Sequence, residues 1–433
     1  MKLQNILSYR KIPASQTYYK VSNIIKTLPK ILIGNFNNSD KVLEFEQQFA
    51  KYCGAKKSCA LPSARIALYY LLKNLKFPEN SEILMTSITI ADIVNMILCN
   101  NLRPRFVDMD IKTLNFSIEA LEKNISKNTR AILITYLYGF IPENLDRVIE
   151  FAKKNKLIII EDFSQALGAQ YKNKKIGTLG DFGIYSCSSF KTLSALFGGM
   201  LISDNIEILE KIKMQAREEL QKPKRLPFLV ISLKILLHKF LNLPIVYSYF
   251  TFYFYSVLNS ISPRLLYIIQ TGNIGVLLGF KKVERYAKIK KELLFYFTDF
   301  QAELGLNNLK ELNDINNKLC LIFQELKKIE GITKYFPNEN SDTQNVYWRI
   351  PLFTHSQIQA MQYFLDCNIE TSLSALPLCS AEECFKEFAI YDCKTAEKIY
   401  NHYLLLPTFA EMSAEQLKHL KKSLEFFLKN YEK

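Results

Sequence analysis

Hydrophobic and polar residues between positions 42 and 162 follow two different periods that take turns along the chain. Some stretches repeat apolar residues every three or four positions, which is typical of amphipathic helices. The runs between them are short and almost continuously apolar, which is typical of strands buried on both faces. Helices are predicted at 42–53, 64–75, 90–101, 116–125 and 145–156, and strands at 82–88, 103–109, 130–139 and 157–162. This alternation predicts an α/β fold with a mainly parallel sheet and crossover helices.

Changes in this pattern divide the chain into four parts. These are an irregular N-terminal arm at 1–40, a large α/β domain at 41–219, an apolar and basic insertion at 220–283, and a smaller α+β C-terminal domain at 284–433. In the last part, charged amphipathic helices are predicted at 283–300 and 413–429, and a strand-like run lies between them at 345–353.

The composition excludes several classes of protein. A chain of 433 residues with 48% hydrophobic and 23% charged residues is expected to bury a large core, so it is neither disordered nor a small disulfide module. Nine cysteines without a C-x-x-C pair predict reduced thiols, and four histidines that are never spaced i, i+4 argue against a metal site or a Ser-His-Asp triad. The first 20 residues lack an apolar core and a small-residue cleavage site, so no signal peptide is predicted and the expected location is the cytoplasm.

Positive charge is concentrated in the insertion. Lys and Arg outnumber Asp and Glu by 56 to 42, and residues 220–283 include eight basic side chains and no acidic one. The same segment is rich in aliphatic and aromatic residues, and seven of the nine residues at 247–255 are aromatic. A groove that follows the phosphates of a nucleic acid is not expected among so many aliphatic side chains. No binding of nucleic acid is therefore expected.

The charge-free run from Leu241 to Pro263 leaves two interpretations open. Its 23 residues exceed the roughly 20 that cross a bilayer, but its Asn, Ser, Thr and Pro residues argue against a simple transmembrane helix. One interpretation is a peripheral contact with the anionic inner surface of the membrane, with aromatic residues at the headgroups and Lys or Arg beside them. The other is an insertion whose apolar face is buried by a partner subunit or covers the substrate.

Candidate catalytic residues gather after the strand predicted at 157–162. In an open parallel sheet, ligands bind beyond the carboxyl ends of the strands, so Asp162 is expected to face a ligand. Lys191 follows in a passage rich in small and hydroxyl-bearing residues, among Ser186, Ser188, Ser189 and Thr192. A lysine kept partly deprotonated by apolar neighbours is suited to attack a carbonyl group, and the hydroxyls are suited to bind a phosphate.

The spacing of these residues forms a longer motif. In order along the chain it comprises Glu161, Asp162, Gln165, Gly168, a Gly-Asp-Phe-Gly sequence at 180–183, Ser186, Lys191 and the pair Gly198–Gly199. This constellation resembles the DegT/DnrJ/EryC1/StrS family of sugar aminotransferases, which are pyridoxal phosphate enzymes of fold type I. The resemblance covers about two thirds of the chain and implies a three-layer α/β fold like that of aspartate aminotransferase.

The resemblance also implies a role for each residue of the site. Lys191 is expected to form the covalent link to the cofactor and then to move the proton during the reaction. Asp162 is expected to pair with the pyridine nitrogen, and Gln165 to contact the ring or its phenolic oxygen. The phosphate is expected to bind Ser186 and the start of a helix, at the backbone amides of Ala64 and Arg65.

The activity implied is the transfer of an amino group from glutamate to a keto-sugar, nucleotide-linked, by a homodimer with a shared active site. Two alternatives stay open. One is a sugar dehydratase of the same family, which uses the same cofactor and in which a histidine replaces the lysine. The other is a non-catalytic regulator or membrane-attached scaffold that keeps the fold and binds the cofactor. The presence of Lys191 favours the aminotransferase over the dehydratase.

Three positions depart from the pattern of the family. Ala64–Arg65 stands where the family usually has Gly-Thr or Gly-Arg, and Thr89–Ile90 stands where an aromatic residue often covers the cofactor ring. An Asn-x-Arg element that reaches the phosphate from the partner subunit aligns with residues 268–273, where Asn273 is the nearest polar candidate.

Overall fold

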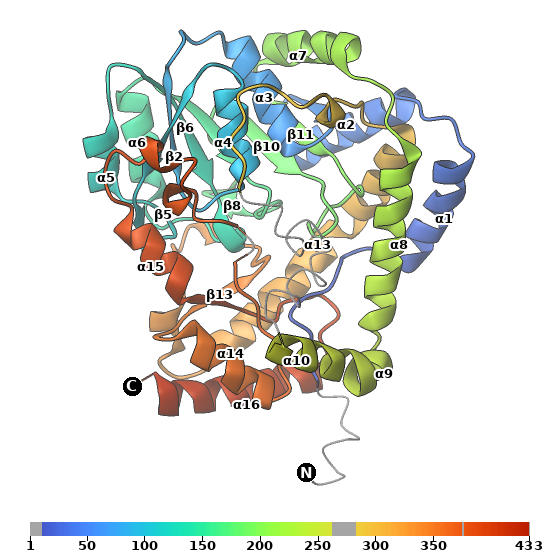
Figure 1. Cartoon of the computed structure of the whole chain (residues 1–433), viewed down its shortest axis with the longest axis vertical. Helices are drawn as coiled ribbons and strands as arrows, with labels where there is room; N and C mark the ends of the chain where they lie inside the picture. The colour runs from blue at the N-terminus through green and yellow to red at the C-terminus, as the bar shows by residue number, and fades with distance from the viewer. Residues whose placement is uncertain (1–10, 262–282, 375, 433) are drawn as a thin grey trace.

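A seven-stranded sheet lies in the upper half of the computed structural model as drawn in Figure 1, and the structure describes residues 11–261, 283–374 and 376–432. In spatial order its strands are β1 (Lys57–Leu61), β11 (Gly199–Ser203), β10 (Phe182–Ser186), β7 (Ile158–Asp162), β6 (Thr129–Thr135), β2 (Glu82–Thr86) and β3 (Arg103–Val107). Neighbours from β10 to β3 run parallel, and β11 is antiparallel to both strands beside it. The prediction of a mainly parallel sheet is confirmed.

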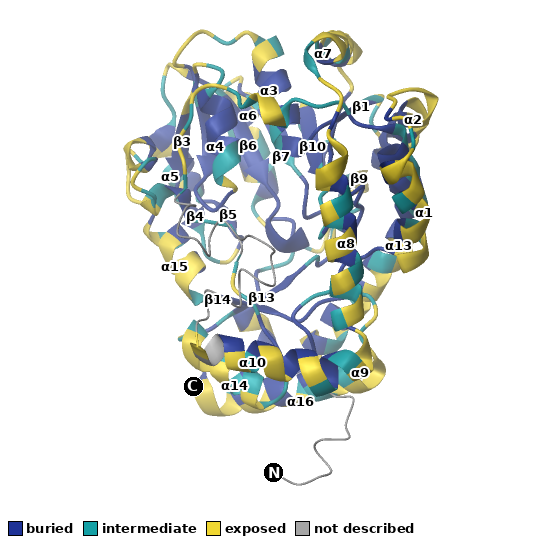
Figure 2. Ribbon diagram, turned by 45° about the vertical axis from the view of Figure 1, so that its right-hand side comes forward, coloured by how far each residue is buried: buried dark blue, intermediate teal, exposed yellow. Residues whose placement is uncertain are grey.

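Helices cover both faces of this sheet, because successive side chains of each strand point to opposite faces. In β6, Ala131 and Leu133 belong to the same apolar cluster as α3 (Ala64–Leu75), α4 (Ala91–Leu98) and α7 (Ile206–Glu219). Ile132 and Ile134 belong to the cluster of α2 (Asp40–Cys53), α5 (Ile118–Asn124) and α6 (Leu145–Lys154). Figure 2 shows the strands as a buried layer between these helices. The expected three-layer α/β architecture is therefore confirmed.

The strand predicted at 130–139 ends early, at Thr135. Tyr138 adopts a φ of 60°, which breaks the extended backbone, and residues Leu137–Gly139 form a 3-10 turn instead. The turn lies at the carboxyl end of β6, the edge of the sheet where ligands bind in folds of this kind.

The N-terminal arm contains a helix, α1 (Val21–Leu32), so the prediction of a wholly irregular arm is wrong there. Ile24 and Ile31 on its inner face are fully buried and share an apolar cluster with Phe228 of α8 (Arg225–Leu241). Pro29 lies inside this helix, where proline is the least favoured residue, so the local sequence did not predict a helix here. Packing against the insertion stabilises this helix.

Residues 283–298 form an irregular strap rather than the first part of the helix predicted at 283–300. The side chain of Asn95 holds the strap on the large domain, because its Nδ2 donates to Glu284 O at 2.8 Å and its Oδ1 accepts from Tyr286 N at 3.1 Å. These bonds occupy backbone groups that a helix would pair internally.

After the strap the chain continues in the long helix α13 (Asp299–Lys327), which packs against α2. The other main elements of the C-terminal domain are β13 (Ile350–Phe353), α14 (Gln357–Asp366), α15 (Lys394–His402), β14 (Tyr403–Leu406) and α16 (Ala414–Tyr431). The helix predicted at 413–429 is confirmed as α16, whose N-terminus has a capping box of Ser413 and Gln416. The strand predicted at 345–353 is confirmed only from Ile350, where pairing with β14 begins.

The described part of the insertion contains α8 followed by α9 (Pro244–Val246), the π-helical turn η3 (Tyr247–Thr251) and α10 (Phe252–Ile261). Among the described residues, no single helix has both the length and the apolar composition to cross a membrane. The helices Arg225–Leu241 and Pro244–Leu258 meet the length and composition criteria only when they are taken together, and they are bent by 69° relative to each other.

Candidate functional site

Two neighbouring strands end at the candidate site. β7 ends at Asp162 and β10 ends at Ser186, and because these strands are parallel neighbours their carboxyl ends meet at one edge of the sheet. Ser164 connects them: its hydroxyl accepts a hydrogen bond from Ser186 N at 3.0 Å, and its backbone N–H donates to Asp162 Oδ1 at 3.0 Å. The structure thus brings Asp162 and Ser186 together.

Lys191 lies on the loop between β10 and β11, against the indole ring of Trp348. Its Nζ is 4.0 Å from the centroid of that ring, and Trp348 Nε1 donates a hydrogen bond to Phe190 O at 2.9 Å. The guanidinium carbon of Arg349 lies 4.6 Å from the same ring. The C-terminal domain therefore fixes the loop that carries the candidate catalytic lysine.

Burial lowers the pKa of Lys191 to about 7; the carboxylate of Asp162 opposes this change and the positive charge of Arg349 adds to it. Burial also raises the pKa of Asp162, against the hydrogen bonds from Ser164 and the charge of Lys191. Both pKa shifts arise from burial, because each charged group loses hydration on leaving water. The opposite charge of the other group compensates part of this lost hydration energy. A substantial fraction of Lys191 is therefore a neutral amine near neutral pH.

This lowered pKa predicts how the reaction of Lys191 with an aldehyde depends on pH. Only the neutral amine attacks a carbonyl, so the rate at which cofactor-free protein captures pyridoxal phosphate should rise with pH and level off above about pH 8. Between about pH 6 and pH 8 the neutral fraction rises roughly tenfold for a pKa of about 7. Stopped-flow absorbance measures the rate, and peptide mapping after borohydride reduction checks the residue.

A lysine with an unperturbed pKa gives a different profile in the same experiment. Its neutral fraction would rise roughly a hundredfold over the same interval, without a plateau. A profile of that kind at Lys191 would contradict the environment that the structure gives this side chain.

The start of α3 provides backbone donors for an anion. Ser63 caps the helix, with its hydroxyl accepting a hydrogen bond from Ile66 N at 3.3 Å. Ala64 and Arg65 begin the first turn, where backbone N–H groups have no acceptor inside the helix. Such amides, together with the helix dipole, attract a phosphate.

Gly199 allows the start of α3 to come this close to the sheet. It is paired with Ser186 across β10 and β11, and a Cβ atom on Gly199 would lie 2.2 Å from Ala64 N. Gly198 forms a bridge with Ser63 and has a φ of 128°, which side-chain-bearing residues rarely adopt. The glycine pair therefore brings Ser186 and the first amides of α3 to the same edge of the sheet.

The side chains of Arg65 and Gln165 are engaged within the protein. Arg65 pairs with Asp92 of α4, and Asp92 also accepts a hydrogen bond from the hydroxyl of Tyr286 at 2.9 Å. Gln165 Oε1 accepts a hydrogen bond from Tyr138 N at 2.8 Å and so holds the turn after β6. Within the described residues, the backbone N–H of Arg65 and the side-chain amide nitrogen of Gln165 donate to no protein group and can bind a ligand.

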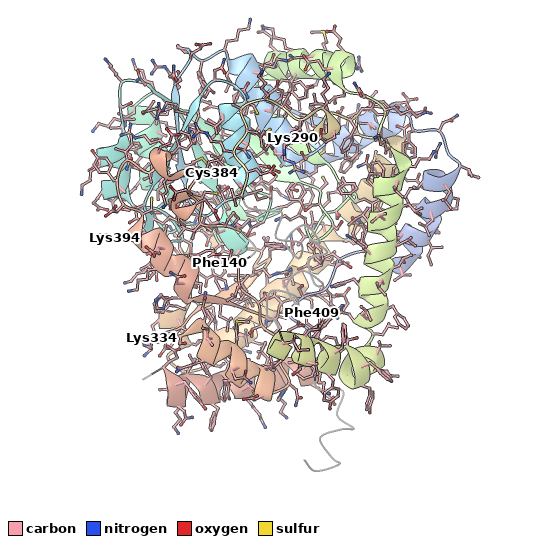
Figure 3. The ribbon with its side chains drawn as sticks, in the orientation of Figure 1. Phe140, Lys290, Lys334, Cys384, Lys394 and Phe409 are labelled. Carbon is pink, nitrogen blue, oxygen red and sulfur yellow. The ribbon has the colours of Figure 1, made fainter. Side chains whose placement is uncertain are left out.

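Trp348 and Arg349 were not predicted as site residues. Arg349 is only 6% exposed, donates to Thr408 O at 3.3 Å, and has no carboxylate within ion-pair distance in the described part of the chain. Tyr347, just before them, packs edge-on against Phe140, labelled in Figure 3, with ring centroids 5.1 Å apart. The one tryptophan of the chain, followed by arginine inside a strand-like run, was the available signal.

Helix α8 of the insertion also reaches the site. The ring of His238 packs edge-on against Phe190, the residue before the lysine, with ring centroids 5.6 Å apart. Burial, with the positive charges of Lys239 and Arg349, lowers the pKa of His238 to about 4, so its ring is neutral at physiological pH. No sequence pattern pointed to this contact.

The remaining sequence predictions concern the ring and the partner subunit. Thr89 is buried and Ile90 is 49% exposed, immediately before α4. Asn273 and the run at 268–273, where the partner contact was expected, lie outside the described residues.

Comparison with known proteins identifies the family. The model of the DegT/DnrJ/EryC1/StrS aminotransferase family matches residues 20–226 and 277–425, so 227–276, the central part of the insertion, is unmatched. GDP-perosamine synthase of Caulobacter vibrioides is 30% identical over 191 residues, which are 44% of this chain and 51% of that protein. GDP-4-keto-6-deoxy-D-mannose 3-dehydratase of Escherichia coli O55:H7 is 30% identical over 179 residues, 40% of this chain and 46% of that protein. The chain spans about half the length of the curated relatives it matches.

The fold is also found among solved structures. The Helicobacter pylori aminotransferase PseC superposes with a TM-score of 0.71 and 20% identity, over 98% of this chain and 99% of that one, and confirms fold type I. The site fits the pyridoxal phosphate of such proteins, since it joins an amine of lowered pKa, a half-buried carboxylate and a cradle of backbone amides. The chain belongs to the DegT/DnrJ/EryC1/StrS aminotransferase family, whose cofactor is pyridoxal phosphate.

Proposed function

We propose that this protein transfers an amino group from glutamate to the carbonyl carbon of a nucleotide-linked keto-sugar, as a cytoplasmic homodimer. The observation that carries the proposal is the environment of Lys191, whose Nζ lies against Trp348 and whose pKa falls to about 7 while Asp162 remains close enough to oppose the shift. An amine in that state both attacks carbonyls and exchanges protons near neutral pH.

Each predicted site residue has a task in this proposal. Pyridoxal phosphate, when bound, supplies a conjugated ring that accepts the electron pair released at the reacting carbon. Lys191 would hold the cofactor and, once released from it, its Nζ would take the proton from the reacting carbon of the substrate and give it to the imine carbon of the cofactor. Asp162 keeps the ring nitrogen protonated, and Gln165 contacts the ring through its amide nitrogen.

The phosphate lies at the other end of the site in this proposal. Ser186 and the amides of Ala64 and Arg65 hold it, at the edge that Gly199 keeps open. Arg65 acts through its backbone, because its guanidinium is paired with Asp92.

Two observations support an anionic sugar substrate. Arg349 is a buried cation beside the lysine without a carboxylate partner among the described residues, and such a group is stabilised by an anion that enters the site. One relative is named for a GDP-linked sugar, GDP-perosamine, in which the diphosphate provides negative charge.

The main alternative is a dehydratase, because one relative is GDP-4-keto-6-deoxy-D-mannose 3-dehydratase. Lys191 favours amino transfer over that reaction, since the dehydrating branch carries a histidine in place of the lysine. A non-catalytic, cofactor-binding scaffold is the second alternative, and it predicts no conversion of either substrate.

A single experiment separates these functions. The holoenzyme is mixed with ¹⁵N-labelled glutamate and a panel of GDP- and UDP-linked 4-keto-sugars, and both products are followed by mass spectrometry. We expect 2-oxoglutarate and an amino-sugar with the heavy nitrogen in equal amounts, and loss and recovery of the cofactor absorbance band. Loss of a hydroxyl from the sugar without uptake of nitrogen would establish the dehydratase, and unchanged substrates would establish the scaffold.

A further inference from the structure

Two helices of the insertion present apolar side chains to the outside. On α8 these are Leu226, Val230, Leu233, Leu237 and Phe240, all between 41% and 67% exposed and spaced alternately by four and three residues. A second row, Phe250, Phe254, Val257 and Ile261, continues on η3 and α10 and is between 55% and 71% exposed. Figure 2 shows exposed residues along both helices, which lie on the near side of the molecule. Single exposed apolar residues are normal on the surface of a folded protein, but nine of them in two rows form a continuous feature that needs an explanation.

The inner faces of the same helices are firmly packed. Phe228 and Ile235 of α8 are buried in a cluster with α1 and the start of α13. The hydroxyl of Tyr247 donates to Glu370 Oε2 at 2.8 Å, and Lys11 Nζ donates to Ser248 O at 2.6 Å. The exposed rows are therefore part of a fixed surface.

The charge of the insertion points to the kind of partner. Residues 220–283 contain eight Lys or Arg and no Asp or Glu. Lys222 and Lys224 are exposed before α8 and have no ion pair within the described residues, and Lys234 is exposed between the apolar residues of the α8 row. A symmetric contact with a second copy would bring the exposed Lys222, Lys224 and Lys234 of two copies close together, and their like charges would repel. A surface of anionic lipid attracts them instead.

The insertion is also an addition to the family fold, because the family model leaves 227–276 unmatched. The two helices have the combined length and composition of a membrane segment, but the 69° bend prevents them from crossing as one rod. Of the seven aromatic residues at 247–255, Phe250, Tyr253 and Phe254 are exposed, and exposed aromatic side chains are suited to the interfacial region of a bilayer.

We propose that α8 and α10 lie on a membrane surface that contains anionic lipids, with both apolar rows inserted among the headgroups and acyl chains. The opposite face of α8 carries His238, whose ring packs against Phe190 beside Lys191. In this arrangement α8 lies between the membrane and the loop that carries Lys191. The proposal does not depend on which sugar reaction the protein performs.

Vesicle flotation tests the proposal with the holoenzyme. The lipids are phosphatidylcholine alone or with phosphatidylglycerol, at low and high salt. We expect at least about tenfold tighter binding to the anionic vesicles, weakened by salt. The triple variant Val230→Glu, Leu237→Glu, Phe254→Glu places charges in both rows and should lose at least about tenfold in affinity.

A matched control separates the position of these charges from their number. Met214→Glu, Leu321→Glu, Phe426→Glu adds three carboxylates at residues 56–59% exposed on α7, α13 and α16, and it should bind vesicles like the unmodified protein. Retained cofactor absorbance and melting temperature show that both variants fold.

Several results would overturn the proposal. They are absence of binding by the unmodified protein, equal binding to neutral and anionic vesicles, or equal loss in both triple variants. Absence of lipid binding together with a smaller oligomer in the Val230, Leu237, Phe254 variant would show instead that a second copy of the chain covers these rows.

Discussion

Replacing Lys191 with alanine is expected to lower kcat for amino transfer by at least about four orders of magnitude, because proton transfer and the positioning of the reacting group are lost together. The variant should bind pyridoxal phosphate more weakly, and borohydride should no longer fix the cofactor to the protein. The fold should persist, because no hydrogen bond or ion pair of the described residues depends on Nζ, which lies against Trp348.

Lys175 provides the matched control for this variant. Its Nζ lies 3.6 Å from the ring centroid of Tyr52, and burial lowers its pKa, so it is also a partly dehydrated lysine against an aromatic ring. Lys175→Ala should retain kcat within about twofold, as surface changes away from a site generally do. Borohydride labelling at Lys175 or elsewhere, or turnover by the Lys191 variant, would refute the proposed role.

Replacing Asp162 with asparagine is expected to lower kcat roughly a thousandfold. A carboxylate about 4 Å from a ring cation contributes about 4 kcal/mol at an effective dielectric constant of 20, which corresponds to that factor. Asparagine retains an oxygen that can accept the hydrogen bond from Ser164 N, so the end of β7 should keep its structure.

A second readout distinguishes a role in catalysis from a purely structural one. The negative charge of Asp162 raises the pKa of Lys191, so its removal should move the midpoint of aldehyde capture below pH about 7. Asp181→Asn, at the amino end of β10, is the control, since Asp181 Oδ2 only accepts a hydrogen bond from Ile159 N at 2.8 Å. An unchanged midpoint in the Asp162 variant, with activity lost only in proportion to stability, would leave Asp162 as a structural residue.

For the insertion, sequence patterns predicted its composition but not its contact with the candidate site. Its apolar and basic composition and the argument against a single crossing helix were evident from the sequence, yet neither indicated that α8 packs on the loop that carries Lys191. His238 lies on α8 and Phe190 on a loop, 48 residues apart along the chain, so their contact leaves no trace in local spacing.

The sequence by itself predicted β2, β3, β6 and β7 of the central sheet, the helices α2 to α6, and the motif that contains Asp162 and Lys191, whereas β1, β10, β11 and α7 were not predicted. The strands are buried on both faces and the helices on one, so their apolar periods are local properties of the chain, as in α3, whose bounds were predicted without error. Asp162 and Ser186 meet because β7 and β10 are parallel neighbours, a strand order that the structure shows and the sequence motif did not predict.

Only the tertiary structure decided which other residues surround Lys191, and in which segments the secondary structure differs from the one that the local sequence pattern predicts. Trp348 and Arg349 reach the lysine from the C-terminal domain, more than 150 residues along the chain, and α1 is helical because α8 packs against it. The strap at 283–298 is irregular despite its helical pattern, because Asn95 binds its backbone. In each case a contact between distant segments outweighs local propensity, and such contacts are not encoded in the spacing of neighbouring residues.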